Sequence, residues 1–325
     1  MKKNLNRTVQ LKDFGILIVF VVLVIALSII SGGTFSTSRN FINILKQTSV
    51  NGILAMGMAF VIISDGIDLS VGSIVALSGV VSCMFAHPAA EGTGGEYPFL
   101  VPILMALLVG VLVGLFNGFL IAYGDIPPFI VTLGSMTIVS GLALIVSGGS
   151  PIYGVTGAYE AIASGKTGFL SIPYLAIYMV LVVAVCAFVL NKTVFGRRVY
   201  AIGGNQVAAS VSGISVRRIR VIVYTISGLL AGLAGLLVAS RTITGSPTAG
   251  KSYEMDAIAA CVIGGVSMSG GSGKWYGVVV GSLMLSVISN GLDILRVNSN
   301  YQLIIKGIII ILAVLMDIKG KAKNH

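Results

Sequence analysis

Residues 99–122 read FLVPILMALLVGVLVGLFNGFLIA, an uninterrupted run without a charged side chain. A helix rises about 1.5 Å per residue, so this run is long enough to cross a bilayer core of about 30 Å. Gly110 and Gly114 have the G-x-x-x-G spacing that is typical of packing faces between membrane helices. The run therefore predicts a transmembrane helix that packs closely against another.

The rest of the chain has the same character. Of 325 residues, 10% are charged and 56% are hydrophobic, and 42 are glycine. Soluble proteins have about 25% charged residues, so an ordinary soluble enzyme is excluded. The net charge of +10 comes from short basic clusters between apolar runs, which form no basic groove, so we expect no binding to nucleic acid. Cys83, Cys186 and Cys261 lie inside apolar runs, which argues against disulfides and zinc.

We predict an all-α polytopic membrane protein with about ten transmembrane helices. The expected spans are residues 14–32, 44–64, 70–86, 99–122, 128–147, 170–190, 219–239, 253–267, 275–292 and 302–318. They form one transmembrane domain over residues 14–318, between an N-terminal tail (1–13) and a C-terminal tail (319–325).

Ten spans place both tails and the loop at 191–218 on one side of the membrane. The segments on that side hold 14 of the 21 basic residues. Cytoplasmic loops are enriched in Lys and Arg, so we expect both termini and this loop to be cytoplasmic. Lys306 falls near the outer end of the last span, where we expect its side chain to extend toward the membrane surface.

The loop at 191–218 contains signals for a helix of its own. Asn205 can cap the N-terminus, Gln206 to Ser212 can form two turns, and Gly213 suits the position after the C-terminus. A helix this short is marginal alone and must dock against something. The small side chains of Ala208, Ala209 and Ser212 would allow close approach of a protein partner. The flanking arginines would equally hold the helix on anionic lipid, and the residues leave both alternatives open.

Residues 63–73, ISDGIDLSVGS, interrupt the apolar sequence with two carboxylates and two glycines. A carboxylate at the bilayer centre costs about 2.5–3.5 kcal/mol, so Asp65 and Asp68 should face a cavity, a partner or a helix terminus. Asp68 or Ser70 could cap the next helix, or these residues could line the substrate path. Both interpretations remain open.

Two further glycine-rich stretches matter for function. The run GGVSMSGGSG at 264–273 predicts another break, and Gly277 and Gly281 repeat the packing spacing of Gly110 and Gly114. Residues 245–252, GSPTAGKS, match the P-loop pattern letter for letter. A working P-loop joins a buried strand to a helix, whereas this stretch follows a membrane helix, so we interpret the match as coincidence.

Six phrases, taken together, resemble the permease family of bacterial ribose and simple-sugar ABC importers. They are GIDLSVGS (66–73), PPFIVTLG (127–134), FGRR (195–198), YAIGGN (200–205), PTAG (247–250) and YEMDAIAA (253–260). The resemblance runs in order over nearly the whole chain. The chain departs from the family at Lys251, where glutamate is usual, and at Ser64-Asp65, where a glycine-rich pair is usual.

The resemblance implies a multi-pass subunit of the bacterial inner membrane that has no catalytic site. Its expected partners are a second copy of itself, cytoplasmic ATPase subunits that bind ATP and Mg²⁺, and an external sugar-binding protein. No cofactor is expected in this chain. The segment from Asn205 to Ile214 resembles the coupling helix of the family, which favours ATPase docking over lipid. Ribose, another monosaccharide and autoinducer-2 remain open as substrates.

The competing hypothesis is an ion-coupled secondary transporter of a small polar solute. Such a transporter needs titratable or ion-binding groups deep in its spans. Only Asp65, Asp68 and Lys306 qualify, and each has an explanation at a helix end. The sequence therefore favours the importer subunit.

Overall fold

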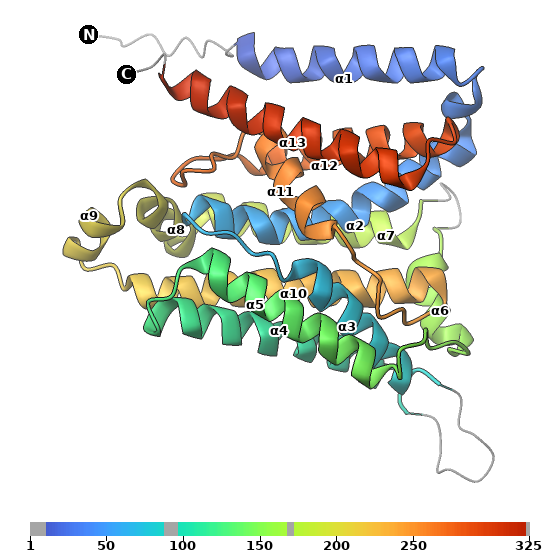
Figure 1. The fold of residues 1–325 in the computed structure, drawn as a ribbon, viewed down its shortest axis with the longest axis horizontal. Helices are drawn as coiled ribbons and strands as arrows, with labels where there is room; N and C mark the ends of the chain where they lie inside the picture. Colours follow the sequence, from blue (N-terminus) through green and yellow to red (C-terminus); the bar gives the residue numbers. More distant parts are fainter. Residues whose placement is uncertain (1–10, 88–96, 168–171, 323–325) are drawn as a thin grey trace.

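A computed structural model describes residues 11–87, 97–167 and 172–322 (Figure 1). The helices in these residues are α1 (Leu11–Ile30), η1 (Thr34–Ser36), α2 (Ser38–Ile63), α3 (Val71–Phe85), α4 (Leu100–Tyr123), α5 (Pro128–Val146), α6 (Gly157–Ser164), α7 (Tyr174–Lys192), α8 (Val194–Gly204), α9 (Gln206–Val211), α10 (Val216–Thr242), α11 (Tyr253–Ile263), α12 (Trp275–Ile294) and α13 (Ser299–Ala322). Outside the helices, these ranges contain two isolated β-bridges and no strand of more than one residue. The prediction of an all-α protein is confirmed.

Each of the ten expected spans coincides with one helix. In the described part of the chain, six helices are long and apolar enough to cross a membrane, namely α2, α4, α5, α7, α10 and α12. The apolar parts of α1, α3 and α13 are shorter. The sequence did not predict α6 or α8, which are short and only weakly apolar.

Several helices begin or end a few residues away from the predicted spans, and two of these differences have a clear cause. The second span begins at Ser38 rather than at residue 44, because the Thr37 side chain caps its N-terminus by accepting from Asn40 N at 3.3 Å. Arg39 therefore lies within this helix. The eighth span ends at Ile263 rather than at residue 267, since Gly264 and Gly265 close the helix and Gly265 has a φ of 80°.

Most of the helices run along the long axis of the molecule (Figure 1). At one end, which we call the α9 end, lie α8 and α9, the start of α1 and the end of α13. At the opposite end, which we call the α6 end, lie α6 and the last turn of α10. The common location of the α1 start, the α13 end and α9 is what the predicted topology requires.

The close packing of α10 against α4 depends on glycine. A Cβ atom at Gly114 would lie 2.9 Å from Thr225 Cα and 3.2 Å from Gly228 Cα. A Cβ atom at Gly232 would lie 3.2 Å from Gly110 Cα. Between α12 and α11, a Cβ atom at Gly281 would lie 3.0 Å from Gly264 N. Both G-x-x-x-G pairs are therefore packing faces, as the sequence predicts.

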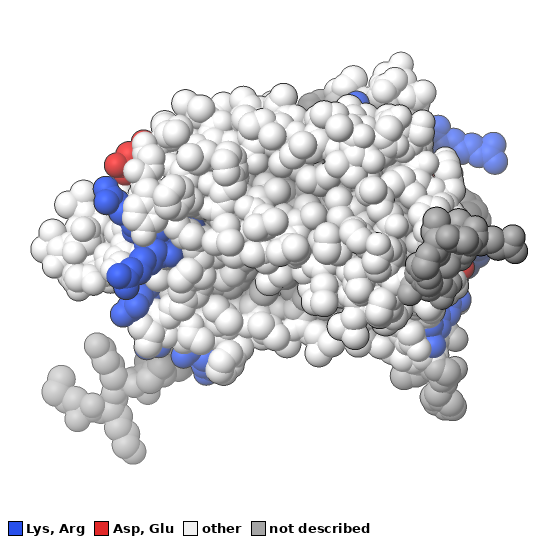
Figure 2. Space-filling model, turned by 90° about the horizontal axis from the view of Figure 1, so that it is seen from below, with Lys and Arg blue, Asp and Glu red and all other residues white. Residues whose placement is uncertain are grey.

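Charged residues gather at the two ends of the molecule on the face seen in Figure 2. The belt between them shows only a small blue patch, at its upper margin. Large apolar side chains of α4 and α5 are exposed, including Leu104, Leu112 and Ile145. A nearly uncharged belt with apolar side chains outward is the surface that a lipid bilayer covers.

Candidate functional site

Two helices, α3 and α11, begin in the middle of the bundle rather than at its ends. After α2, residues 64–70 return from the α9 end, and after α10, residues 243–252 return from the α6 end (Figure 1). The starts of α3 and α11 meet at Gly72 and Gly250, where a Cβ on either residue would collide with the carbonyl of the other. The two glycines therefore permit contact between the backbones of two broken helices.

Asp68 is the centre of a buried hydrogen-bond network at the start of α3. Its Oδ1 accepts from Ser70 N at 3.0 Å and from Ser70 Oγ at 2.6 Å, and its Oδ2 accepts from Ser227 Oγ at 2.7 Å. Asn117 Nδ2 donates to Ser70 Oγ at 2.9 Å. Asp68, Ser70 and Asn117 are fully buried. The network holds the irregular segment at 64–70 in place through hydrogen bonds to Asn117 of α4 and Ser227 of α10.

The same segment is held by its backbone. Tyr224 Oη and Thr132 Oγ1 both donate to Ile67 O, at 3.3 Å and 3.4 Å. Unpaired backbone groups are costly inside a membrane, so irregular backbone there needs such partners. Asp65, in contrast, lies exposed in the turn after α2 with a φ of 64°. The structure thus brings Asp68 and Ser70 together and places Asp65 apart from them.

A groove of about 450 Å³ lies where α3, α5 and the start of α11 meet. Ser73, Ser140, Thr248 and Glu254 contribute polar atoms to its lining, and Met255 contributes an apolar side chain. This volume falls within the range of about 300–1,000 Å³ that is usual for small-molecule sites. We call it the central groove; hydroxyl and carboxylate groups in such a setting can bind a small polar molecule.

The lining residues after α10 belong to the stretch that resembles a P-loop. Gly245 pairs with Ile152 through an isolated β-bridge, and a Cβ there would lie 2.9 Å from Cys83 Cβ. Gly250 has a φ of 80° and packs on Gly72. These glycines have structural roles in packing. Sequence reasoning did not assign Thr248 or Glu254 to a site; the phrases PTAG and YEMDAIAA were the available signals.

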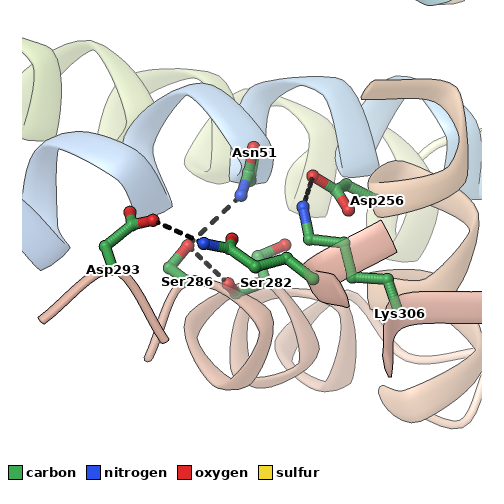
Figure 3. A network of polar contacts seen from close by, with 7 residues as sticks. Asn51, Asp256, Ser282, Ser286, Asp293 and Lys306 are labelled. Carbon is green, nitrogen blue, oxygen red and sulfur yellow. Dashed lines mark hydrogen bonds and ion pairs between the residues drawn. The ribbon is translucent and has the colours of Figure 1, made fainter. Parts of the chain in front are cut away.

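Lys306 does not extend toward the membrane surface as we expected. Its Nζ lies 2.8 Å from Asp256 Oδ2, and the two side chains are 18% and 9% exposed. Figure 3 shows this ion pair near a hydrogen bond from Asn51 of α2 to Ser286 of α12. The expectation was wrong because Asp256, 50 positions earlier, supplies a buried counter-charge that a reading of the last span alone does not reveal.

The helix predicted at residues 206–212 is α9, and its cap has the predicted geometry. Asn205 Oδ1 accepts from Ala208 N at 2.9 Å, and Gly213 has a φ of 81°. Ala208 and Ser212 are exposed, whereas Ala209 is only 5% exposed because it packs against the chain itself. Ala209 therefore cannot contribute a contact surface to a partner.

The exposed apolar side chains of α9 are Val207 and Val211, at 74% and 85% exposure. A groove of about 660 Å³ lies beside them and is lined also by Ile214, Arg217 and Arg220. Exposed valines next to arginines form a surface suited to a protein partner. The sequence missed these valines because it suggested small residues as the contact.

The Asp68 network predicts a clear difference between two aspartates. Asp68→Ala leaves the hydroxyls of Ser70 and Ser227 and one backbone N–H without their acceptor, so we expect a loss of about 1–3 kcal/mol in stability. Asp65→Asn should have little effect, since Asp65 is exposed and Asn tolerates a positive φ. The measurement is the melting temperature of each purified variant in detergent. Equal melting temperatures for Asp68→Ala and the unmodified protein would contradict the structural role of the network.

Comparison with known proteins places this arrangement in a family. Residues 40–314 match the family model described as branched-chain amino acid transport system / permease component. The ribose import permease protein of Bacillus subtilis (strain 168) is 48% identical over 301 residues, which cover 93% of this chain and 91% of the relative. That of Escherichia coli (strain K12) is 43% identical over 307 residues, which cover 93% and 92%.

The galactose/methyl galactoside import permease protein of Haemophilus influenzae (strain ATCC 51907 / DSM 11121 / KW20 / Rd) is 40% identical over 318 residues, which cover 94% of this chain and 95% of the relative. No solved structure matches the chain. The chain therefore belongs to this family of permease subunits of bacterial import systems, and it is a multi-pass protein of the inner membrane.

Proposed function

We propose that the chain is the translocation subunit of an ATP-driven importer of ribose or a closely similar monosaccharide. The observation that carries this proposal is the identity of 48% to a ribose import permease over nearly the full length. A relative named for galactose is 40% identical, so ribose is favoured over hexoses by similarity alone. Membership of the permease family argues against an ion-coupled transporter.

The proposed topology has ten crossings and the α9 end in the cytoplasm. Each crossing corresponds to α1, α2, α3, α4, α5, α7, α10, α11, α12 or α13. The broken passages, α3 and α11, are completed by the irregular segments that precede them, at 64–70 and 243–252. Arg197, Arg198, Arg217, Arg218 and Arg220 belong to the α9 end, as the positive-inside rule requires for a cytoplasmic face.

ATP and Mg²⁺ would be bound by a separate ATPase that docks on α9. The exposed Val207 and Val211 supply the apolar contact, and the neighbouring arginines supply charge. Asn205 and Gly213 fix the ends of α9, and Gln206 Oε1 accepts a hydrogen bond from Arg220 Nη2 at 2.7 Å. The α9 backbone is therefore presented in one defined orientation.

The central groove would be the sugar path, completed by a second copy of the chain. In this subunit the groove is open, and α5 beside it exposes apolar side chains such as Leu133 and Ile138. A second copy would cover that face, and an external binding protein would deliver sugar to the α6 end. Asp68 and Ser70 precede the groove-lining Gly72 and Ser73, so they position the wall of the path.

Ribose uptake tests the substrate. Cells without a ribose importer of their own should accumulate radiolabelled ribose when they express the chain with its ATPase and binding protein. Xylose and galactose are competitors, and a strain that lacks only this chain is the control. Uptake of another sugar in place of ribose would overturn the substrate assignment.

Val211→Arg tests the role of α9. An arginine in an apolar contact lacks a partner, so copurification of the ATPase and sugar uptake should both fall by about tenfold or more. If α9 lay on lipid, the added charge would instead strengthen membrane binding by about 1 kcal/mol and leave uptake intact. Ser150→Arg is the matched control, because it adds the same charge in an exposed turn that follows α5, far from α9. Normal copurification with Val211→Arg would reject the docking role.

Single cysteines test the topology. Asn205→Cys should react with an impermeant thiol reagent only from the cytoplasmic side, and Ser150→Cys only from outside. The native Cys83, Cys186 and Cys261 are buried, so their background labelling should be low. The reverse pattern of labelling would contradict the orientation.

A further inference from the structure

A second polar cavity lies at the α6 end, apart from the central groove. It consists of two hollows of about 490 Å³ and 220 Å³ that share Gln47, Arg241 and Asp293 in their linings. Side chains of α2, α10, α12 and α13 line it, together with Asp256 of α11. None of the lining residues of the central groove belongs to it. We call it the α6-end cavity.

Three acceptor oxygens on side chains that line this cavity have no hydrogen-bond partner among the residues that the structure describes. They are Gln47 Oε1, Asn290 Oδ1 and Asp256 Oδ1. Asn290 and Asp256 are only 5% and 6% exposed. A buried unpaired polar atom is costly, so three of them on side chains that line one cavity favour a ligand that supplies donors and turns these side chains toward itself.

The cavity also presents donors that are not engaged. Lys46 and Arg241 line it, and in the described part of the chain neither forms an ion pair or a hydrogen bond. The other charged side chains are already paired. Lys306 is bonded to Asp256, and Gln302 Nε2 donates to Asp293 Oδ1 at 2.9 Å (Figure 3).

This set of groups selects a particular ligand chemistry. An anion would gain from Lys46 and Arg241, but it would face the unpaired oxygens of Asn290, Gln47 and Asp256. A metal ion would gain from the oxygens but be repelled by three nearby cations. A sugar hydroxyl both donates and accepts, so a neutral polyhydroxylated molecule can satisfy both kinds of group at once.

We propose that the α6-end cavity binds a monosaccharide within each subunit. This inference rests on the proposed function, since it places the transported class of molecule at a second site. On the proposed topology the cavity faces outward, where sugar first reaches the subunit. Asn290 and Gln47 accept from sugar hydroxyls, and Lys46 and Arg241 donate to them.

Protection of an introduced cysteine tests the site. Asn43 lines the cavity and is exposed, so Asn43→Cys should react with a small neutral maleimide. The sample is the permease with its ATPase, reconstituted in nanodiscs without the binding protein. Ribose, xylose or galactose at about nine times its Kd leaves about a tenth of the sites empty, so labelling should slow about tenfold.

Matched variants show whether the unpaired oxygens cause the protection. In the Asn43→Cys background, Asn290→Leu removes an acceptor at similar size and should abolish protection. Gln47→Leu, at a partly exposed position, makes the same test if Asn290→Leu fails to assemble. Asn300→Leu, an exposed position outside the cavity, should leave protection unchanged. Ser140→Cys reports separately on sugar in the central groove.

The outcomes separate this site from the proposed function. Absence of protection by all three sugars overturns the site, even if the importer transports ribose. Protection that survives both Asn290→Leu and Gln47→Leu also overturns it. So does protection by ribose 5-phosphate or by Ca²⁺ without protection by free sugar. Ribose uptake by the same complex with its binding protein reports on the proposed function independently.

Discussion

The structure depends on pairing the backbone of broken helices inside an apolar bundle. Residues 64–70 and 243–252 are irregular, yet water is not available to satisfy their N–H and C=O groups in a membrane. Side chains of neighbouring helices do so instead. Tyr224 and Thr132 donate to Ile67 O. In the segment before α11, backbone partners do the same, because Gly245 and Ile152 exchange two N–H···O bonds of 2.9 Å. These contacts explain why polar residues occur within otherwise apolar runs.

Hydrogen bonding alone would not bring the starts of α3 and α11 together. Glycine at the point of contact makes their close approach possible. The helix starts at Gly72 and Gly250 approach so closely that any side chain would collide with backbone. Their N-termini carry partial positive charge, which favours the oxygen atoms of a polar solute nearby. The central groove lies at this meeting point, so the constraint that shapes the fold also creates the candidate path.

Local patterns in the sequence determined the location of the helices, and long-range contacts determined what it could not predict. The apolar runs located ten helices, and the residues from Asn205 to Gly213 located α9 with its caps, because both signals lie within one turn or one span. The ion pair between Lys306 and Asp256 joins two helices and has no local signal. The early start of α2 has a local signal, the Thr37 cap, but Arg39 and Asn40 in its first turn look like loop residues before an apolar run.

The contacts of α8 connect the proposed docking helix to the end of α2 and to the turn before α12. Gly271 N donates to Ile63 O at 2.9 Å, which joins the end of α2 to the break before α12. Gly203 of α8 packs against the same Ile63 carbonyl, and Tyr200 Oη, also of α8, donates a hydrogen bond to Gly273 O. Since α9 follows α8 after a single residue, a displacement of α9 must either carry these contacts with it or break them. Broken helices transmit displacement through their hinges, so the α9 end is where a partner's movement can reach the central groove.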